Sequence, residues 1–112
     1  MSDAFAATPE PPYYAVIFTS QLKGRDESYE RMAQAMFDLA AKQPGYLGAE
    51  HARRDGGLGI TVAYFTDEAA IRAWKANAEH VAAQRLGIER WYSRYHLRVA
   101  KVERAYGGPE GR

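Results

Sequence analysis

Apolar and polar positions alternate along the chain with a period that changes several times. Residues 13–22 are apolar at odd and even positions alike, which indicates a strand that is covered on both faces. Over residues 29–40 the apolar side chains recur every three or four positions, as on one face of a helix. Asp26 can cap the start of this predicted helix, and Pro44 followed by Gly45 ends it.

Two further strands and a hairpin follow this helix. Alternating apolar residues predict strands over about 46–53 and 58–65. The Arg-Asp-Gly-Gly run at 54–57 is a hairpin signal, because Asp-Gly and Gly-Gly pairs accept positive φ. The glycines lead into a strand and not into a helix, so they do not form a phosphate-binding loop.

The last third of the chain predicts a second helical region and a fourth strand. Thr66 can cap the helical region, whose apolar pattern loses phase near Asn77 and resumes toward Trp91. This pattern predicts two short helices or one kinked helix. A strand over about 92–104 follows, and its alternation slips by one residue at 99–100, as a β-bulge there would cause.

The predicted order of elements is β-α-β-β-α-β. This is the ferredoxin-like arrangement of the α+β class, an antiparallel four-stranded sheet with both helices on one face. The folded domain is expected over residues 12–106, between a flexible leader (1–11) and a flexible tail (107–112). The other face of the sheet is apolar, so we expect it to pack against a second copy of the chain in a homodimer.

Composition narrows the classes of function. The chain has 15 basic and 14 acidic residues and a net charge of +1, so we expect no nucleic-acid or membrane partner. It has no cysteine, which excludes disulfides, thiolate catalysis and cysteine metal sites. Its 3 histidines are well separated, so no metal site is expected. The start lacks the pattern of a signal peptide and no apolar run could span a bilayer, so a cytoplasmic location is expected.

Three stretches of the sequence carry a resemblance to a known family. They are the helix end Gln43-Pro-Gly-Tyr-Leu-Gly48, the run from Gly59 to Trp74, and the pair Glu79-His80. Together with the first strand, they make residues 13–105 resemble the antibiotic biosynthesis monooxygenase domain. The resemblance implies a dimeric α+β barrel, with a pocket in each subunit between the sheet and the helices.

Haem-degrading members of this family resemble the chain less well. Their pattern has an Asn on the first strand, a Trp on the second helical region and a His ten residues after that Trp. Trp74 matches the Trp, but Gln84 stands where the His would be, and the first strand has no Asn. The resemblance therefore disfavours haem binding and haem degradation, and no cofactor is expected.

Two groups of residues are candidates for a site. His80, Trp74 and Gln84 on the second helical region are the catalytic candidates, because histidine exchanges protons near neutral pH and the other two can donate hydrogen bonds. The aromatic residues expected to line a ligand pocket are Tyr64, Trp91, Tyr92 and Tyr95. Of these, Tyr64 and Tyr95 are expected as the walls opposite Trp74. For each aromatic residue the alternative is packing in the core, at the barrel end or at the dimer seam.

Two classes of function remain open. One is a small cofactor-independent monooxygenase that acts on an aromatic or polyketide-like small molecule in a dry pocket, with a base that forms the substrate anion. The other is a non-catalytic dimer that binds a hydrophobic or aromatic small molecule in the same cavity. A pocket with His80 or a tyrosine hydroxyl directed into it favours the enzyme. A cavity filled by aromatic side chains favours the alternative.

Overall fold

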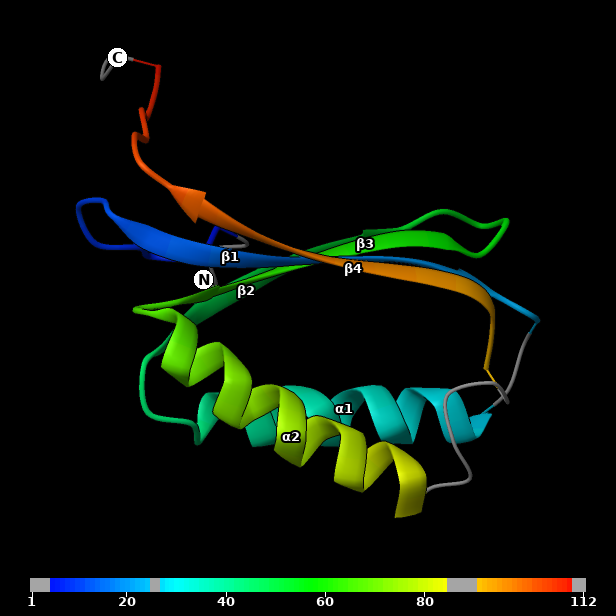
Figure 1. Cartoon of the computed structure of the whole chain (residues 1–112). Coiled ribbons are helices and arrows are strands. Elements are labelled where there is room, and N and C mark those ends of the chain that lie inside the picture. Colours follow the sequence, from blue (N-terminus) through cyan, green and yellow to red (C-terminus); the bar gives the residue numbers. More distant parts are fainter. Residues whose placement is uncertain (1–4, 25–26, 85–90, 110–112) are drawn as a thin grey trace.

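The computed structural model describes residues 5–24, 27–84 and 91–109, and for residues 79–84 it describes the backbone alone. A four-stranded antiparallel sheet forms one layer, and two helices that lie side by side form the other (Figure 1). The strands are β1 (Tyr13–Leu22), β2 (Tyr46–Arg53), β3 (Leu58–Phe65) and β4 (Tyr92–Val102), and the helices are α1 (Glu27–Ala41) and α2 (Glu68–Gln84). The strand order in the sheet is β2-β3-β1-β4. This is the ferredoxin-like α+β fold that the sequence predicts.

The even-numbered positions of β1 face the helices. Val16 is buried in a cluster with Ala63 and Phe65 of β3 and Ile71 of α2. Phe18, two residues further along β1, packs against a second cluster on the same face. The alternation along β1 could not show which set of side chains faces the helices, because both sets are apolar.

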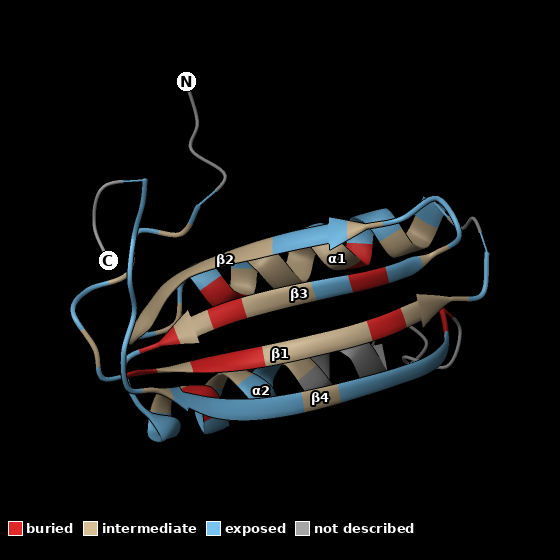
Figure 2. Cartoon of the chain, turned by 90° about the horizontal axis from the view of Figure 1, so that it is seen from above, coloured by how far each residue is buried: buried red, intermediate tan, exposed pale blue. Residues whose placement is uncertain are grey.

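The core has two parts, toward opposite ends of the layer between sheet and helices. The second part contains the buried side chains Met32 of α1 and Trp91 and Tyr92 at the start of β4. In Figure 2 the buried segments of β1 and β3 lie toward the two ends of each strand, with half-buried residues and, on β3, an exposed one between them. Burying a side chain of this size stabilises the fold by about 2 kcal/mol relative to leaving it exposed.

The sheet face away from the helices carries an apolar row. On this face Ile17 of β1 lies opposite Val62 of β3, and Thr19 lies opposite Ile60. Ile60 is 47% exposed. Figure 2 looks onto this face, and no helix or strand in the described part of the chain covers it. A second copy of the chain would bury this row, which is why the sequence predicts a dimer.

Asp67 caps the start of α2. Its Oδ1 accepts a hydrogen bond from the backbone N–H of Ala70 at 2.8 Å. The prediction that Thr66 caps this helix is wrong, because the side chain one position later reaches the third N–H of the helix. From its start at Glu68 the helix runs without a break to Gln84, so the alternative of two short helices over this stretch is also wrong. The cap predicted for α1 lies outside the described residues.

The irregularity of β4 lies at its start. The strand pairs with β1 without interruption over residues 94–102, so the bulge predicted at 99–100 is wrong. The register shift falls at Ser93, which has no Cα partner on β1. The slip in alternation at residues 99–100 has a different cause. Because β4 is an edge strand and Val99 is 48% exposed, burial does not require apolar residues to alternate strictly there.

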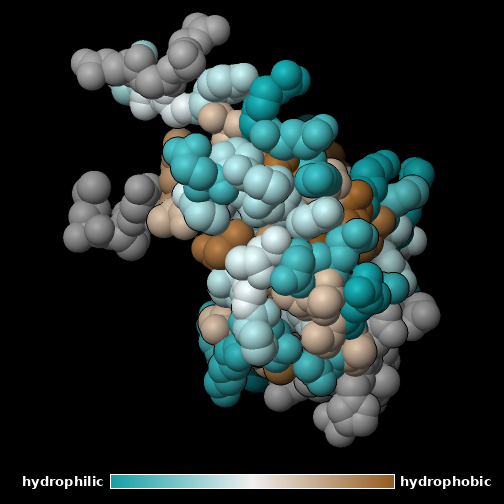
Figure 3. Space-filling view, turned by 60° about the vertical axis from the view of Figure 1, so that its left-hand side comes forward, coloured by the Kyte–Doolittle hydropathy of each residue, from teal (hydrophilic) through white to brown (hydrophobic). Residues whose placement is uncertain are grey.

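The segment before β1 is tied to the sheet. The backbone N–H of Ala6 donates a hydrogen bond to Glu50 Oε2 of β2 at 3.0 Å. On the side of the molecule seen in Figure 3, apolar residues form separate patches among hydrophilic ones. The division into leader, domain and tail stays a prediction.

Candidate functional site

Trp74 of α2 lies between the helices and the sheet. It is half-buried and packs on the first core cluster, with its ring centroid 5.8 Å from that of Phe65. Its Nε1–H is fully buried, and no acceptor among the described residues receives its hydrogen bond. A buried donor without an acceptor costs about 1–3 kcal/mol. Within the described residues, this N–H is a buried donor whose hydrogen bond is not made.

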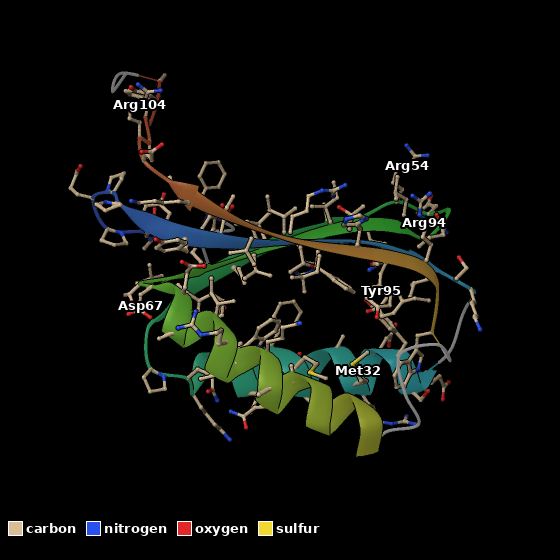
Figure 4. The ribbon with its side chains drawn as sticks, in the orientation of Figure 1. Met32, Arg54, Asp67, Arg94, Tyr95 and Arg104 are labelled. Atoms are coloured by element: carbon tan, nitrogen blue, oxygen red, sulfur yellow. The ribbon has the colours of Figure 1, made fainter. Side chains whose placement is uncertain are left out.

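Tyr92 is the centre of an aromatic cluster in the second part of the core. Its ring meets Phe18 at 5.4 Å and 77°, and Tyr29 at 5.8 Å and 86°, both edge to face. The ring centroid of Tyr95 lies 5.7 Å from that of Phe18. Figure 4 shows Tyr95 below β4, in the layer between the sheet and Met32 of α1. The structure thus brings Tyr92 and Tyr95 together, as the sequence predicts.

The Tyr92 hydroxyl is held in its neutral form. Burial raises its pKa above the ordinary value for tyrosine, and the neighbouring Tyr29 hydroxyl adds to the rise. The positive charge of Arg53 acts on this pKa in the opposite direction. A phenol with a raised pKa can donate a hydrogen bond at neutral pH, but it is a poor base.

Trp91 is buried with its hydrogen bond made. Its Nε1 donates to Ser28 Oγ of α1 at 2.9 Å, which joins the start of β4 to the first turn of that helix. Trp91 therefore packs in the core, which is the alternative to a ligand contact that the sequence left open. A ligand contact by this residue stays a prediction.

Arg53 forms a polar cluster that the sequence analysis missed. The side chain is half-buried at the end of β2 and reaches across β3 to β1. Its Nη2 donates to Ser20 Oγ at 2.8 Å and to the Tyr29 hydroxyl at 3.2 Å. Its Nη1 donates to the Ser20 carbonyl at 3.4 Å and to the Gly57 carbonyl. The guanidinium also lies 5.6 Å from the centroid of the Tyr29 ring, within the range of a cation–π contact.

Two signals in the sequence pointed to this cluster. Ser20 is a polar residue in the even-numbered row of β1, where its neighbours are apolar, and it is buried to 2% exposure. Gly59 interrupts β3, and a glycine within a strand often marks a close approach of another group. A Cβ at Gly59 would lie 2.5 Å from Arg53 Cζ, so the glycine leaves the room that the guanidinium fills.

Tyr64 faces away from the helices. It lies opposite Ala15 and Gly48, and its hydroxyl donates to Glu50 Oε1 at 2.7 Å. The expectation that Tyr64 forms a wall opposite Trp74 is therefore wrong, because successive strand residues alternate between faces. Burial and the Glu50 carboxylate raise the Tyr64 pKa to about 12.

Tyr95 also lies apart from Trp74, because it belongs to the second aromatic cluster and Trp74 packs on the first. The other catalytic candidates, His80 and Gln84, are on α2, six and ten residues after Trp74. Their side chains lie outside the described residues. The roles of these two residues, and any ligand contact by Tyr64 or Tyr95, stay predictions.

A hollow of about 350 Å³ opens between α1 and the edge of the sheet formed by β2. Its walls include Tyr29 and Phe37 of α1, His51 and Arg53 of β2, and Thr61 of β3. The Phe37 and His51 rings lie against each other, with centroids 5.3 Å apart and planes at 36°. A volume of this size is at the lower end of small-molecule pockets.

A larger hollow, of about 910 Å³, adjoins Arg53 on the side of the β2–β3 hairpin. Its walls carry both signs of charge, including Lys23, Glu27 and Glu30. Within the described residues, no three acidic or histidine side chains are grouped so that they could hold a metal ion. Neither described helix combines the length and the hydropathy that a crossing of a bilayer requires.

Comparison with known proteins places this geometry in a family. The family model described as "Antibiotic biosynthesis monooxygenase" matches residues 12–86. The chain belongs to the antibiotic biosynthesis monooxygenase family. The match extends from β1 through α2, so it includes the layer between sheet and helices in which Trp74 lies.

One known protein is similar to the chain in sequence, and solved structures are similar to it in fold. The uncharacterized protein YqjZ of Bacillus subtilis (strain 168) is 49% identical over 104 residues, which are 93% of this chain and 91% of that protein. The solved structure of a mutant of SnoaB from Streptomyces nogalater, described as a cofactor-independent oxygenase, matches with a TM-score of 0.69 and 14% identity. It covers 83% of this chain and 95% of SnoaB. PA3566 from Pseudomonas aeruginosa matches with a TM-score of 0.65 and 20% identity, over 88% of this chain and 99% of that one. At these identities the two solved structures show a shared fold.

Proposed function

We propose that this member of the antibiotic biosynthesis monooxygenase family is a small monooxygenase that needs no cofactor and acts on an aromatic, polyketide-like small molecule. The observation that carries the proposal is the buried Trp74 Nε1–H, which has no acceptor among the described residues. The description of SnoaB as a cofactor-independent oxygenase supports the same reaction class. The family match adds to this, because it includes Trp74.

The proposed reaction needs only the substrate and O₂. A cyclic ketone with an acidic CH₂ between two aromatic rings loses a proton and becomes an enolate. The enolate carbon transfers an electron to O₂, and recombination forms a C–OOH group on that carbon. Loss of water then leaves a new C=O. One oxygen atom of O₂ enters the product, the other leaves as water, and the CH₂ carbon is oxidised.

In this proposal Trp74 acts on the oxygen of the enolate. Its Nε1–H donates to that oxygen while negative charge develops there, and a donor fixed in a dry layer stabilises such charge more than water does. The apolar neighbours Phe65 and Ile71 keep water away from the reacting carbon. His80 is proposed as the base that takes the proton, and Gln84 as a further donor, because histidine titrates near neutral pH and a glutamine amide donates hydrogen bonds.

The functional unit is proposed to be a homodimer. The sheet face away from the helices carries the exposed Ile60 and its neighbours, and two such faces can pack on each other with a twofold axis. Pairing of the sheets would leave the layer that contains Trp74 separate in each subunit.

Oxygen uptake tests the proposal. Anthrone is the probe, because its CH₂ lies between two aromatic rings and its oxidation product, anthraquinone, is easily measured. We expect the wild type to raise the rate of anthrone oxidation above the protein-free rate, and Trp74→Phe to lose about tenfold or more of that increase. Equal rates with and without the wild-type protein would reject the monooxygenase.

A non-catalytic dimer that binds a hydrophobic molecule is the second candidate. The observation that favours it is that Trp74 packs on Phe65, while the two hollows described above are not lined by Trp74. A binding protein of this kind would bind anthrone or anthraquinone without raising the rate of oxidation.

A further inference from the structure

The hollow between α1 and β2 contains a cation, Arg53, that has no acidic hydrogen-bond partner among the described residues. Arg53 lines it, and the four hydrogen bonds given above all go to uncharged groups: two backbone carbonyls, one serine hydroxyl and one tyrosine hydroxyl. The donors of these four hydrogen bonds are Nη1 and Nη2, and none of the four uses Nε. A half-buried guanidinium that has lost part of its hydration without gaining an anion attracts one.

The remaining walls of the hollow suit a flat apolar group. Phe37 and His51 lie ring against ring, and the Tyr29 ring lies below the guanidinium. Thr61 adds a further polar residue to the walls. Planar rings pack well against such aromatic walls. At about 350 Å³ the hollow has room for one small ring with one polar substituent.

Glu30 limits the charge of an occupant. It also lines the hollow, is exposed to solvent, and is not among the hydrogen-bond partners of Arg53 given above. Its carboxylate would repel a second negative charge, so a monoanion fits this hollow better than a dianion.

We infer that the hollow between α1 and β2 is a binding site for a small planar aromatic acid, with the carboxylate at Arg53 and the ring against Phe37 and His51. This site is distinct from the layer around Trp74. The inference does not depend on the proposed monooxygenase activity, and a protein without that activity could still bind the acid here.

Benzoate and benzamide test the site as a matched pair, because they have the same ring and differ in charge. Calorimetric titration of the full chain should show benzoate binding about tenfold or more tightly than benzamide, and more tightly than acetate, which has the charge without the ring. Arg53→Gln should abolish the preference for benzoate, and His51→Ala should weaken benzoate binding. Arg72→Gln is the control, because Arg72 is exposed on α2 and does not line the hollow.

Arginine side-chain NMR provides a test that needs no variant to fold. Benzoate should shift the Nε–H resonance of Arg53 and leave that of Arg94 in place, since Arg94 projects from the opposite side of the sheet (Figure 4). Equal affinity for benzoate, benzamide and acetate, or an unshifted Arg53 resonance at saturating benzoate, would overturn the assignment. Loss of anthrone oxidation in Trp74→Phe with benzoate binding intact would show that the two sites are separate.

Discussion

The Arg53 guanidinium passes over Gly59 of β3 and donates a hydrogen bond to Ser20 Oγ of β1 at 2.8 Å. One side chain thus connects an edge strand to a strand two positions away in the sheet. The contact works only because Gly59 has no Cβ. The same contact holds the positive charge of Arg53 beside the Tyr29 ring. Both residues line the hollow between α1 and β2, so the packing of the sheet fixes where the charge lies in that hollow.

Gly59→Ala should destabilise the fold by about 2 kcal/mol, because the new methyl group would meet the Arg53 guanidinium at 2.5 Å. The same change in an Arg53→Ala background should cost at least about 1 kcal/mol less, since the clash is then absent. Chemical denaturation of the two single variants and the double variant measures this coupling. Gly56→Ala is the control, because a Cβ there meets nothing within 4 Å. Additive costs would mean that the two side chains do not meet.

The two tryptophans should respond differently to replacement by phenylalanine. Trp91→Phe removes a hydrogen bond to Ser28 Oγ and should destabilise the fold by about 1 kcal/mol beyond the loss of ring volume. Trp74→Phe removes a buried N–H that has no acceptor among the described residues, which offsets the loss of volume. Thermal melting should therefore show the larger decrease for Trp91→Phe. Equal decreases would indicate that the Trp74 N–H has an acceptor in the unliganded protein.

The pKa of Tyr64, raised to about 12, predicts a dependence on alkaline pH. Folding favours the neutral phenol, so its contribution to stability is complete below the unfolded value of about 10 and is lost as the pH rises toward 12. Glu50→Gln removes a negative charge next to the hydroxyl and should lower the Tyr64 pKa. Ultraviolet absorbance of tyrosinate at about pH 11 should then be higher for Glu50→Gln than for the wild type. An unchanged titration curve would contradict the Glu50–Tyr64 contact.

Val62→Lys tests the proposed dimer. Val62 lies opposite Ile17 on the uncovered face of the sheet, and a lysine there would place a charge at the centre of a packed pair of sheets. Light scattering should show a dimer for the wild type and a mass near 12.5 kDa for the variant. Ala76→Lys, on an exposed part of α2, is the control and should stay dimeric. A wild-type monomer at micromolar concentration would reject the dimer.

Much of the fold could be predicted from the sequence because the elements differ in period. The predicted ranges 13–22, 46–53 and 58–65 match the observed strands, because each strand ends at a break in alternation or at a turn. The choice of cap between Thr66 and Asp67 could not be predicted, because both residue types cap helices and only the geometry separates them. The position of the register shift in β4 could not be predicted either, because the exposed residues of an edge strand do not have to alternate strictly.

The candidate site could be predicted only in part. The spacing of apolar residues along α2 was enough to place Trp74 on the inner face. Alternation alone does not say which face of β3 lies under the helices, so the position expected for Tyr64 is on the wrong side of the sheet. The Arg53–Ser20 contact joins residues 33 positions apart. Ser20 and Gly59 mark an unusual place in the sheet, but no local pattern shows that Arg53 is the side chain that fills it.

Labelled oxygen decides whether the layer around Trp74 catalyses a monooxygenation. Anthrone is incubated with chelator-treated protein under ¹⁸O₂, and the anthraquinone is analysed by mass spectrometry. The proposed reaction predicts one ¹⁸O atom in the new carbonyl, formed at a rate well above that of the protein-free control and reduced in Trp74→Phe. A rate equal to that of the control, or a new carbonyl whose oxygen comes from water, would contradict it.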